Sequence, residues 1–175
     1  APLAVPFLPV KASWVAIEAT SLSLAPDKID LYTLELSEIM VFSGMENVAL
    51  PLQRSLPAPP VASSPNKPRH QQFLTDGFTP FLMNGAQGSS SKSGRLVPKS
   101  SNQTLTIDLK ASQPVHQINL HTADVTLSVP TARLSSHAVP RHVRITGANR
   151  PDFADETFLC EYEQQTIYDN GPIII

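Results

Sequence analysis

Apolar and polar residues alternate with period two along two segments near the start of the chain. Residues 13–19 (Ser-Trp-Val-Ala-Ile-Glu-Ala) alternate large apolar residues with small or polar ones, as a half-buried strand does. Residues 34–42 are either strand throughout or a short helical turn leading into a strand, and the Ser-Gly that follows favours strand over 39–42. The pattern therefore predicts two early strands, with Trp14 facing the core.

The second half of the chain contains further strand candidates at short spacing, separated by turns rich in Pro, Ser, Asn and Gly. They cover residues 105–109, 116–121, 125–129, 142–146 and 157–162. Short strands joined by such turns predict an all-β antiparallel sandwich or barrel.

Two polar tracts interrupt this pattern. Residues 51–68 are rich in Pro and Ser, which is typical of an extended linker or a surface strap without a core of its own. Residues 83–102 form a second tract, and a loop of this length in a compact domain is usually either functional or mobile.

Composition supports a β-rich chain and excludes several classes of protein. The 175 residues include 17 prolines, 41% are hydrophobic and only 16% are charged, so long helices and wholesale disorder are both disfavoured. No apolar run reaches the roughly 18 residues that a membrane span requires. With 13 basic and 15 acidic side chains the net charge is −2, which argues against a nucleic-acid partner.

The cysteine content and the first residues bear on processing and cellular location. Cys160 is the only cysteine, which excludes an intrachain disulfide and a cysteine-based zinc site. Residues 1–7 (Ala-Pro-Leu-Ala-Val-Pro-Phe) lack the basic and apolar regions of a signal peptide, so a mature or excised piece is expected.

No catalytic motif is present, and the expectation is a protein that is not an enzyme. The five histidines show neither HxH nor HExxH spacing and are interpreted as structural or surface residues. G-x-S-x-G, P-loop and G-x-G-x-x-G motifs are all missing from the sequence. Asp152, Asp155 and Glu156 contain a carboxylate pair of the kind used in glycoside cleavage, but a solvated turn between two strands explains them better.

A second acidic turn is more informative. Thr75-Asp76-Gly77 and Thr79 place carboxylate and hydroxyl oxygens around a glycine, and such oxygens suit one hard cation. A plain Asx-turn uses the same residue types, and spacing alone favours that turn.

Several motifs resemble the discoidin or coagulation-factor type C family, also called galactose-binding-like domains. Residues 73–79 (Phe-Leu-Thr-Asp-Gly-Phe-Thr) resemble its early D-G loop, and residues 103–121 resemble its I-D-L strand pair. Residues 139–153 are similar to the strand and the S-x-D-P-x-F turn of bacterial members. The resemblance implies a jelly-roll-like, galactose-binding-like sandwich of about eight strands.

The segment that resembles the closing strands of this family comes first in the chain. Residues 10–42 are similar to the family's final A-R-Y-V-R-I and L-A-E-V-E-V-F strands. Either one domain is circularly permuted or residues 1–50 finish a preceding copy in a tandem array. Because a lone chain must cover its open sheet edge, a permuted single domain over 1–175 is favoured, with closing strands 1–50, a linker at 51–68 and a main body at 69–175.

The resemblance also implies ligands and a location. It implies a structural calcium ion held by Asp76, Thr79 and Glu38, and a glycan or cell-surface polysaccharide bound by loop residues. The expected glycan-binding residues are His121, Arg141, Phe81 and Arg150. An extracellular or periplasmic location beside neighbouring domains is implied as well.

Two function classes follow. One is a non-catalytic carbohydrate-binding or adhesive module of an exported multidomain bacterial protein, and the other is a structural or protein-interaction domain packed beside a catalytic domain. Only eleven aromatic residues are available, and the predicted core uses several of them. That core comprises Trp14, Ile17, Ile39, Val41, Leu105, Ile107, Leu109, Ile118, Leu120, Val143, Ile145, Phe158 and Tyr162.

Overall fold

The described part of the chain is built from strands. A computed structural model describes residues 3–4, 7–24, 32–50, 61–64, 74–75, 77, 94–96, 103–122, 140–163 and 173–174. These residues form twelve strands and no helix, which confirms the all-β prediction. The predicted strand at 125–129 and the predicted site residues Phe81, Asp76 and Thr79 lie outside this part of the chain.

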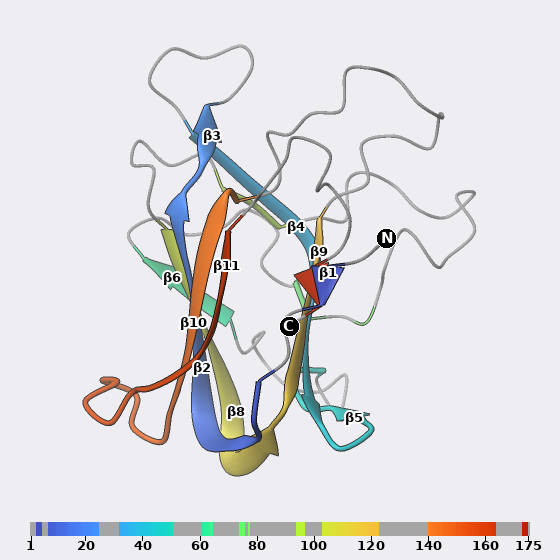
Figure 1. Cartoon of the computed structure of the whole chain (residues 1–175), viewed down its shortest axis with the longest axis vertical. Helices are drawn as coiled ribbons and strands as arrows, with labels where there is room; N and C mark the ends of the chain where they lie inside the picture. Colours follow the sequence, from blue (N-terminus) through green and yellow to red (C-terminus); the bar gives the residue numbers. More distant parts are fainter. Residues whose placement is uncertain are drawn as a thin grey trace.

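Five strands form one antiparallel sheet, called here the five-stranded sheet (Figure 1). Its order is β11-β10-β2-β8-β6, so β2 lies in the middle, between β8 and β10. The strands are β2 (Val10–Ser21), β6 (Val61–Ser64), β8 (Gln103–Val115), β10 (His142–Ala148) and β11 (Thr157–Glu163). Strand β6 falls within the predicted linker and pairs with β8.

The other strands form the seven-stranded sheet, ordered β1-β12-β9-β4-β3, with β5 and β7 also paired to β4. All its pairs are antiparallel except the short pair of β1 with β12. The bounds are β1 (Leu3–Ala4), β3 (Ser23–Leu24), β4 (Tyr32–Ser43), β5 (Glu46–Asn47), β7 (Gly94–Leu96), β9 (Gln117–Thr122) and β12 (Ile173–Ile174).

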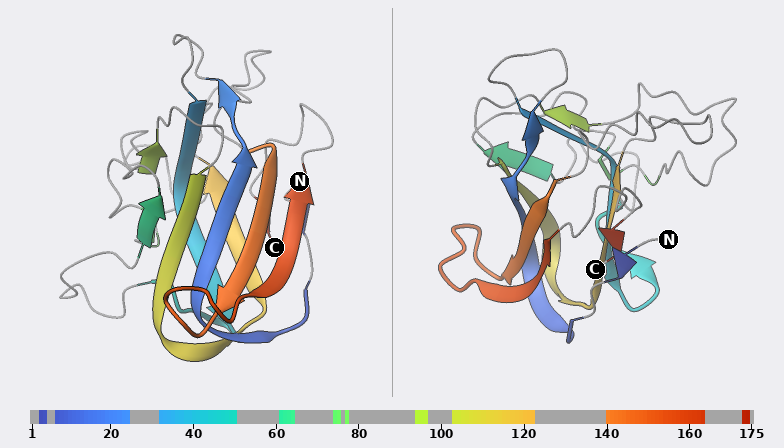
Figure 2. Two further views of the ribbon diagram at one scale, coloured as in Figure 1. Left: turned by 90° about the vertical axis from the view of Figure 1, so that its left-hand side faces the viewer. Right: turned by 45° about the horizontal axis from the view of Figure 1, so that its top comes forward.

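The two sheets face each other as the layers of a β-sandwich, and one core lies between them (Figure 2). Its members include Val15, Ile17, Leu105, Ile107, Val143 and Ile145 from the five-stranded sheet and Leu34, Leu36, Ile39, Val41, Ile118 and Leu120 from the seven-stranded sheet. The chain passes from β8 into β9 through His116, at the lower end in Figure 1, where the His116 N–H donates to Phe42 O.

The first fifty residues share both sheets with the second half of the chain. Strand β2 pairs with β8 and β10, and β4 pairs with β9. This is the packing that the order of the motifs predicts for the segments around Trp14 and residues 39–42.

Two β-bulges change which side chains point into the core. In β4 the register with β9 shifts between Leu36 and Glu38, so Leu36 and Ile39 both face inward while Glu38 faces outward. In β11 the pairing with β10 skips Leu159, because Ile145 is opposite Cys160 and Thr146 is opposite Phe158. An extra residue in one strand reverses the alternation beyond it.

The prediction that Phe158 and Trp14 lie in the core is wrong. Phe158 is 54% exposed because the bulge at Leu159 turns it to the outer face. Trp14 is only partly buried, since Val15 and Ile17 occupy the inward positions of β2 and Trp14 has the opposite parity. The other predicted core residues, including Tyr162, are buried.

Candidate functional site

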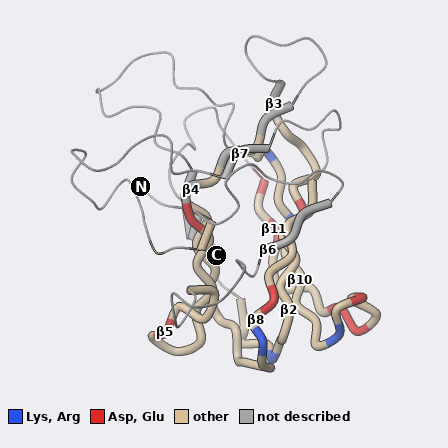
Figure 3. Tube along the Cα trace, turned by 180° about the vertical axis from the view of Figure 1, so that it is seen from behind, with Lys and Arg blue, Asp and Glu red and all other residues tan. Residues whose placement is uncertain are grey.

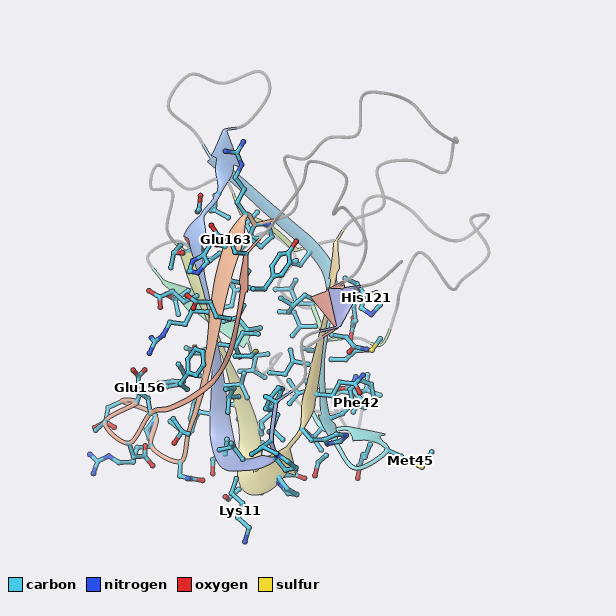
Figure 4. All side chains as sticks on the ribbon, viewed as in Figure 1. Lys11, Phe42, Met45, His121, Glu156 and Glu163 are labelled. Atoms are coloured by element: carbon cyan, nitrogen blue, oxygen red, sulfur yellow. The ribbon has the colours of Figure 1, made fainter. Side chains whose placement is uncertain are left out.

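The main candidate site lies on the outer face of the seven-stranded sheet and joins two residues that the sequence assigned to separate sites. Glu38 of β4 and His121 of β9 are direct cross-strand partners. Directly opposed residues of an antiparallel pair project to the same face, with Cβ atoms about 5 Å apart. Figure 4 shows His121 on the β9 side of the sandwich, away from the five-stranded sheet. We call this pair the Glu38–His121 site.

Leu74 and Gly77 of the D-G segment are joined to β4 by two hydrogen bonds. The Ile39 N–H donates to Leu74 O at 2.7 Å, and the Gly77 N–H donates to Glu38 Oε1 at 3.0 Å. Gly77 has φ +79°, and a Cβ atom on it would lie 3.0 Å from Leu50 Cδ1. Glycine is therefore required both by the backbone conformation and by the close approach.

Polar side chains of this face and of the D-G segment are buried. Glu38 is completely buried, and Thr75 is 1% exposed. Farther along β9, Asn119 is 9% exposed and accepts a 2.9 Å hydrogen bond from Gln117 Nε2. Burial lowers the pKa of His121, so its imidazole is neutral at neutral pH.

A buried carboxylate held by a loop N–H is an anionic oxygen donor suited to a hard cation. Glu38 is the one member of the predicted calcium set that the structure describes, and its burial fits such a role. Among the described residues, no three His, Cys, Asp or Glu side chains come together as a metal-binding group. The other predicted ligands, Asp76 and Thr79, are not among them.

The two arginines predicted to bind sugar lie at opposite ends of β10. Arg141 is exposed at the start of the strand, where its N–H donates to Ser21 O at 2.8 Å. Arg150 follows the end of the strand, and its guanidinium donates to Asp152 at 3.0 and 2.7 Å. A strand of this length spans about 23 Å, so a single sugar ring does not reach both arginines.

The acidic turn at residues 149–156 uses its carboxylates internally. Asp155 accepts the N–H groups of Asn149 and Arg150, each at 3.1 Å, and Asp152 accepts the Ala154 N–H at 3.2 Å. The hydrogen bond from Arg150 lowers the pKa of Asp152. These contacts are those of a turn, which sequence reasoning preferred to an acid/base pair.

The outer face of the five-stranded sheet carries a polar network that sequence reasoning missed. His142 Nε2 is 2.6 Å from Glu161 Oε1, and its Nδ1 is hydrogen-bonded to Thr20 Oγ1. Arg144 forms ion pairs with Glu18 at 3.6 Å and with Glu156 at 3.2 Å. The sequence could have revealed this network, because its polar residues in β2, β10 and β11 alternate with core residues and therefore face outward.

Cys160 is unsuited to nucleophilic chemistry. Its side chain is buried, and burial raises the pKa of the thiol to about 12. A thiol with this pKa is protonated at neutral pH and is a poor nucleophile.

Comparisons with known proteins do not assign the chain to a family. No family model, curated protein or solved structure matches it. Among the described residues there is also no helix with the length and apolar character needed to cross a membrane.

Proposed function

We propose that the chain is a non-catalytic carbohydrate-binding or adhesive module of an exported multidomain bacterial protein, located outside the cytoplasm. The observation that carries the proposal is the Glu38–His121 site, in which a buried carboxylate accepts the Gly77 N–H and is the cross-strand partner of an imidazole. The resemblance of residues 73–79 and 103–121 to discoidin-type domains points the same way.

The chemistry of the site suits sugar hydroxyls. A neutral imidazole offers one donor and one acceptor nitrogen, and a sugar hydroxyl needs one of each. Because burial lowers the pKa of His121, the imidazole keeps both functions at neutral pH. We assign the primary hydroxyl contact to His121, and Phe81 and Arg141 are the further contacts that the resemblance implies.

We further propose that a calcium ion organises the loop, with ligands from Glu38, Asp76 and Thr79. When bound, it supplies positive charge beside the buried Glu38 carboxylate, whose desolvation is otherwise costly. An ion that binds the folded state raises the melting temperature by mass action. We expect added calcium to raise it, a chelator to lower it, and the Glu38→Gln variant to respond to neither. A melting temperature that ignores both reagents contradicts the ion.

A glycan array with the whole chain tests the sugar. His121→Ala is expected to weaken binding by about 1–3 kcal/mol, the cost of leaving a desolvated hydroxyl unpaired. Arg141→Ala and Arg150→Ala test the two ends of β10 separately, because a single sugar ring does not reach both. Unchanged affinity in His121→Ala and Arg141→Ala, with the fold intact, moves the site elsewhere.

The second candidate function is a structural or protein-interaction domain beside a catalytic neighbour. Exposed apolar side chains favour it, because Met45 in the β4–β5 turn is fully exposed (Figure 4). Leu8, two residues before β2, is 84% exposed. Exposed apolar side chains of this kind mark protein contacts when they gather into a patch. This candidate is supported instead if the glycan array shows no binding and the Met45→Ala variant no longer binds the neighbouring domain.

A further inference from the structure

The outer face of the seven-stranded sheet continues beyond the Glu38–His121 site as a stripe of amide and apolar side chains. In the register of β4 with β9, Met40 is opposite Asn119 and Phe42 is opposite Gln117. The residues that alternate with these four on both strands are fully buried in the core, so the four side chains project from the outer face. We call these four residues the amide stripe.

The amide stripe is partly open to solvent. Met40, Phe42 and Gln117 are each partly exposed, and Asn119 is 9% exposed. Figure 4 shows Phe42 and His121 on the same side of the sandwich, away from the five-stranded sheet. Because a strand rises about 3.3 Å per residue, Gln117 and His121 lie about 13 Å apart along β9. The stripe and the Glu38–His121 site together are therefore longer than one sugar ring.

The two amide groups of the stripe orient each other. Gln117 Nε2 donates to Asn119 Oδ1 at 2.9 Å. Among the residues that the structure describes, Asn119 Nδ2 and Gln117 Oε1 have no hydrogen-bond partner. The first of these atoms is a donor and the second is an acceptor. The stripe therefore presents one donor and one acceptor that are already oriented, and preorganised groups lose less entropy when a ligand binds.

The stripe carries no charge. Strand β9 contains no Lys, Arg, Asp or Glu, and neither does β4 after Glu38. Figure 3 shows the contrast within the molecule, since charged positions gather along the five-stranded sheet and the β10–β11 turn, whereas β4 is uncharged from Glu38 to β5. A charged group that binds at the stripe loses water without gaining a counter-charge, which is costly. The ligand that fits the stripe is therefore neutral.

We propose that the amide stripe extends the Glu38–His121 site, so that the chain binds a neutral oligosaccharide along β9 in preference to a single sugar. This inference rests on the proposed sugar-binding function and adds the length and the charge of the ligand. Asn119 Nδ2 donates to one hydroxyl and Gln117 Oε1 accepts from another, while the Phe42 ring packs against the apolar face of the same sugar. His121 contacts the sugar at the other end of the chain.

Isothermal titration calorimetry of the whole chain, with calcium present, measures the dependence on ligand length and charge. The neutral probes are oligomers of galactose, of glucose and of N-acetylglucosamine, each from the monosaccharide to the tetrasaccharide. Galacturonic acid oligomers are the charged probes, and a capped Gly-Ser peptide is the neutral probe that is not a sugar. We expect affinity for one neutral series to rise about tenfold with length, because further hydrogen bonds and a ring contact are made. The charged oligomers and the peptide are expected to bind more weakly.

Conservative variants locate the added contacts. Gln117→Met keeps the length of the side chain without its amide, and Phe42→Leu keeps an apolar side chain without its ring. Each is expected to abolish most of the gain in affinity with length, whereas His121→Ala is expected to weaken binding at every length. Glu161→Gln, on the other sheet, is the matched control and should bind like the wild type. Circular dichroism confirms the fold of each variant.

The outcomes separate this inference from the proposed function. If the monosaccharide binds as tightly as every longer chain, or if both stripe variants keep the full gain with length, the stripe is not part of the site and the Glu38–His121 site stands. Equal binding of galacturonic acid oligomers or of the peptide overturns the preference for a neutral sugar. If no sugar binds at any length, this inference and the proposed function are both wrong.

Discussion

The outer faces of the two sheets begin from the same period-two alternation and reach different environments. On the five-stranded sheet, Glu18 and Arg144 pair in water, with side chains 40% and 37% exposed. On the seven-stranded sheet, Glu38 is completely buried, and the Gly77 N–H of the D-G segment donates to its carboxylate. A polar residue at an outward strand position is therefore a surface residue or a buried anchor, depending on whether another segment covers it.

The sharpest test of this comparison replaces one glutamate on each face. Glu38→Ala is expected to lower the free energy of unfolding by about 1–3 kcal/mol, because it leaves the half-buried Gly77 N–H without its acceptor. Glu18→Ala, on an exposed face, is expected to change it by less than about 0.5 kcal/mol. Urea denaturation of both variants measures the difference, and equal effects would show that the contact with the D-G segment contributes nothing.

The D-G segment itself is tested at its glycine. Gly77→Ala should cost about 1–3 kcal/mol, since it places a side chain at φ +79° and against Leu50. Gly44 in the β4–β5 turn is the control: it has φ +63° but no atom within 4 Å of an added Cβ. Gly44→Ala carries only the backbone penalty, about 1–2 kcal/mol. A smaller loss for Gly77→Ala than for Gly44→Ala, measured by thermal unfolding, contradicts the close approach.

The burial of His121 predicts a pH dependence of stability. Because its pKa is lowered in the folded state, the unfolded chain binds the proton first as the pH falls. The lowered pKa of His121 does not change the stability of the fold well above pH 6.5, the ordinary pKa of histidine. Below that pH it destabilises the fold progressively. We expect His121→Asn to reduce the loss of stability between about pH 7 and pH 5, measured by denaturation at each pH. The matched His142→Gln variant on the exposed face should leave the His121 contribution in place.

The smallest effect is expected for Arg144→Ala. Its ion pairs with Glu18 and Glu156 are exposed, and exposed ion pairs contribute little to stability. The melting temperature should stay within experimental error of the wild-type value at both low and high salt. A marked decrease at low salt would indicate that the charged network of this face stabilises the fold.

The amino-acid sequence by itself determined the class of fold and the position of the longer strands. Alternation of apolar and polar residues was sufficient to predict β2, β8 and β10. In these segments the residues favour an extended backbone, and the strands have one buried and one outer face, so both signals indicate a strand. The resemblance to discoidin-type domains also pointed to Glu38 and His121, and the Asp76-Gly77 segment stood out as a turn with carboxylate and hydroxyl oxygens. The sequence did not reveal that Glu38 and His121 are partners, because pairing joins residues far apart in the chain.

The tertiary structure decided which face of each strand is buried. Alternation defines two faces but not which one is inside, and Trp14 competes with Val15 and Ile17 for the core of β2. The bulge at Leu159 reverses the parity of Phe158, although Cys160 and Tyr162 remain inside. A bulge is set by the pairing of two strands, so neither strand alone records it. The same reason places Glu38 outward, where it accepts the Gly77 N–H, instead of in the core beside Leu36.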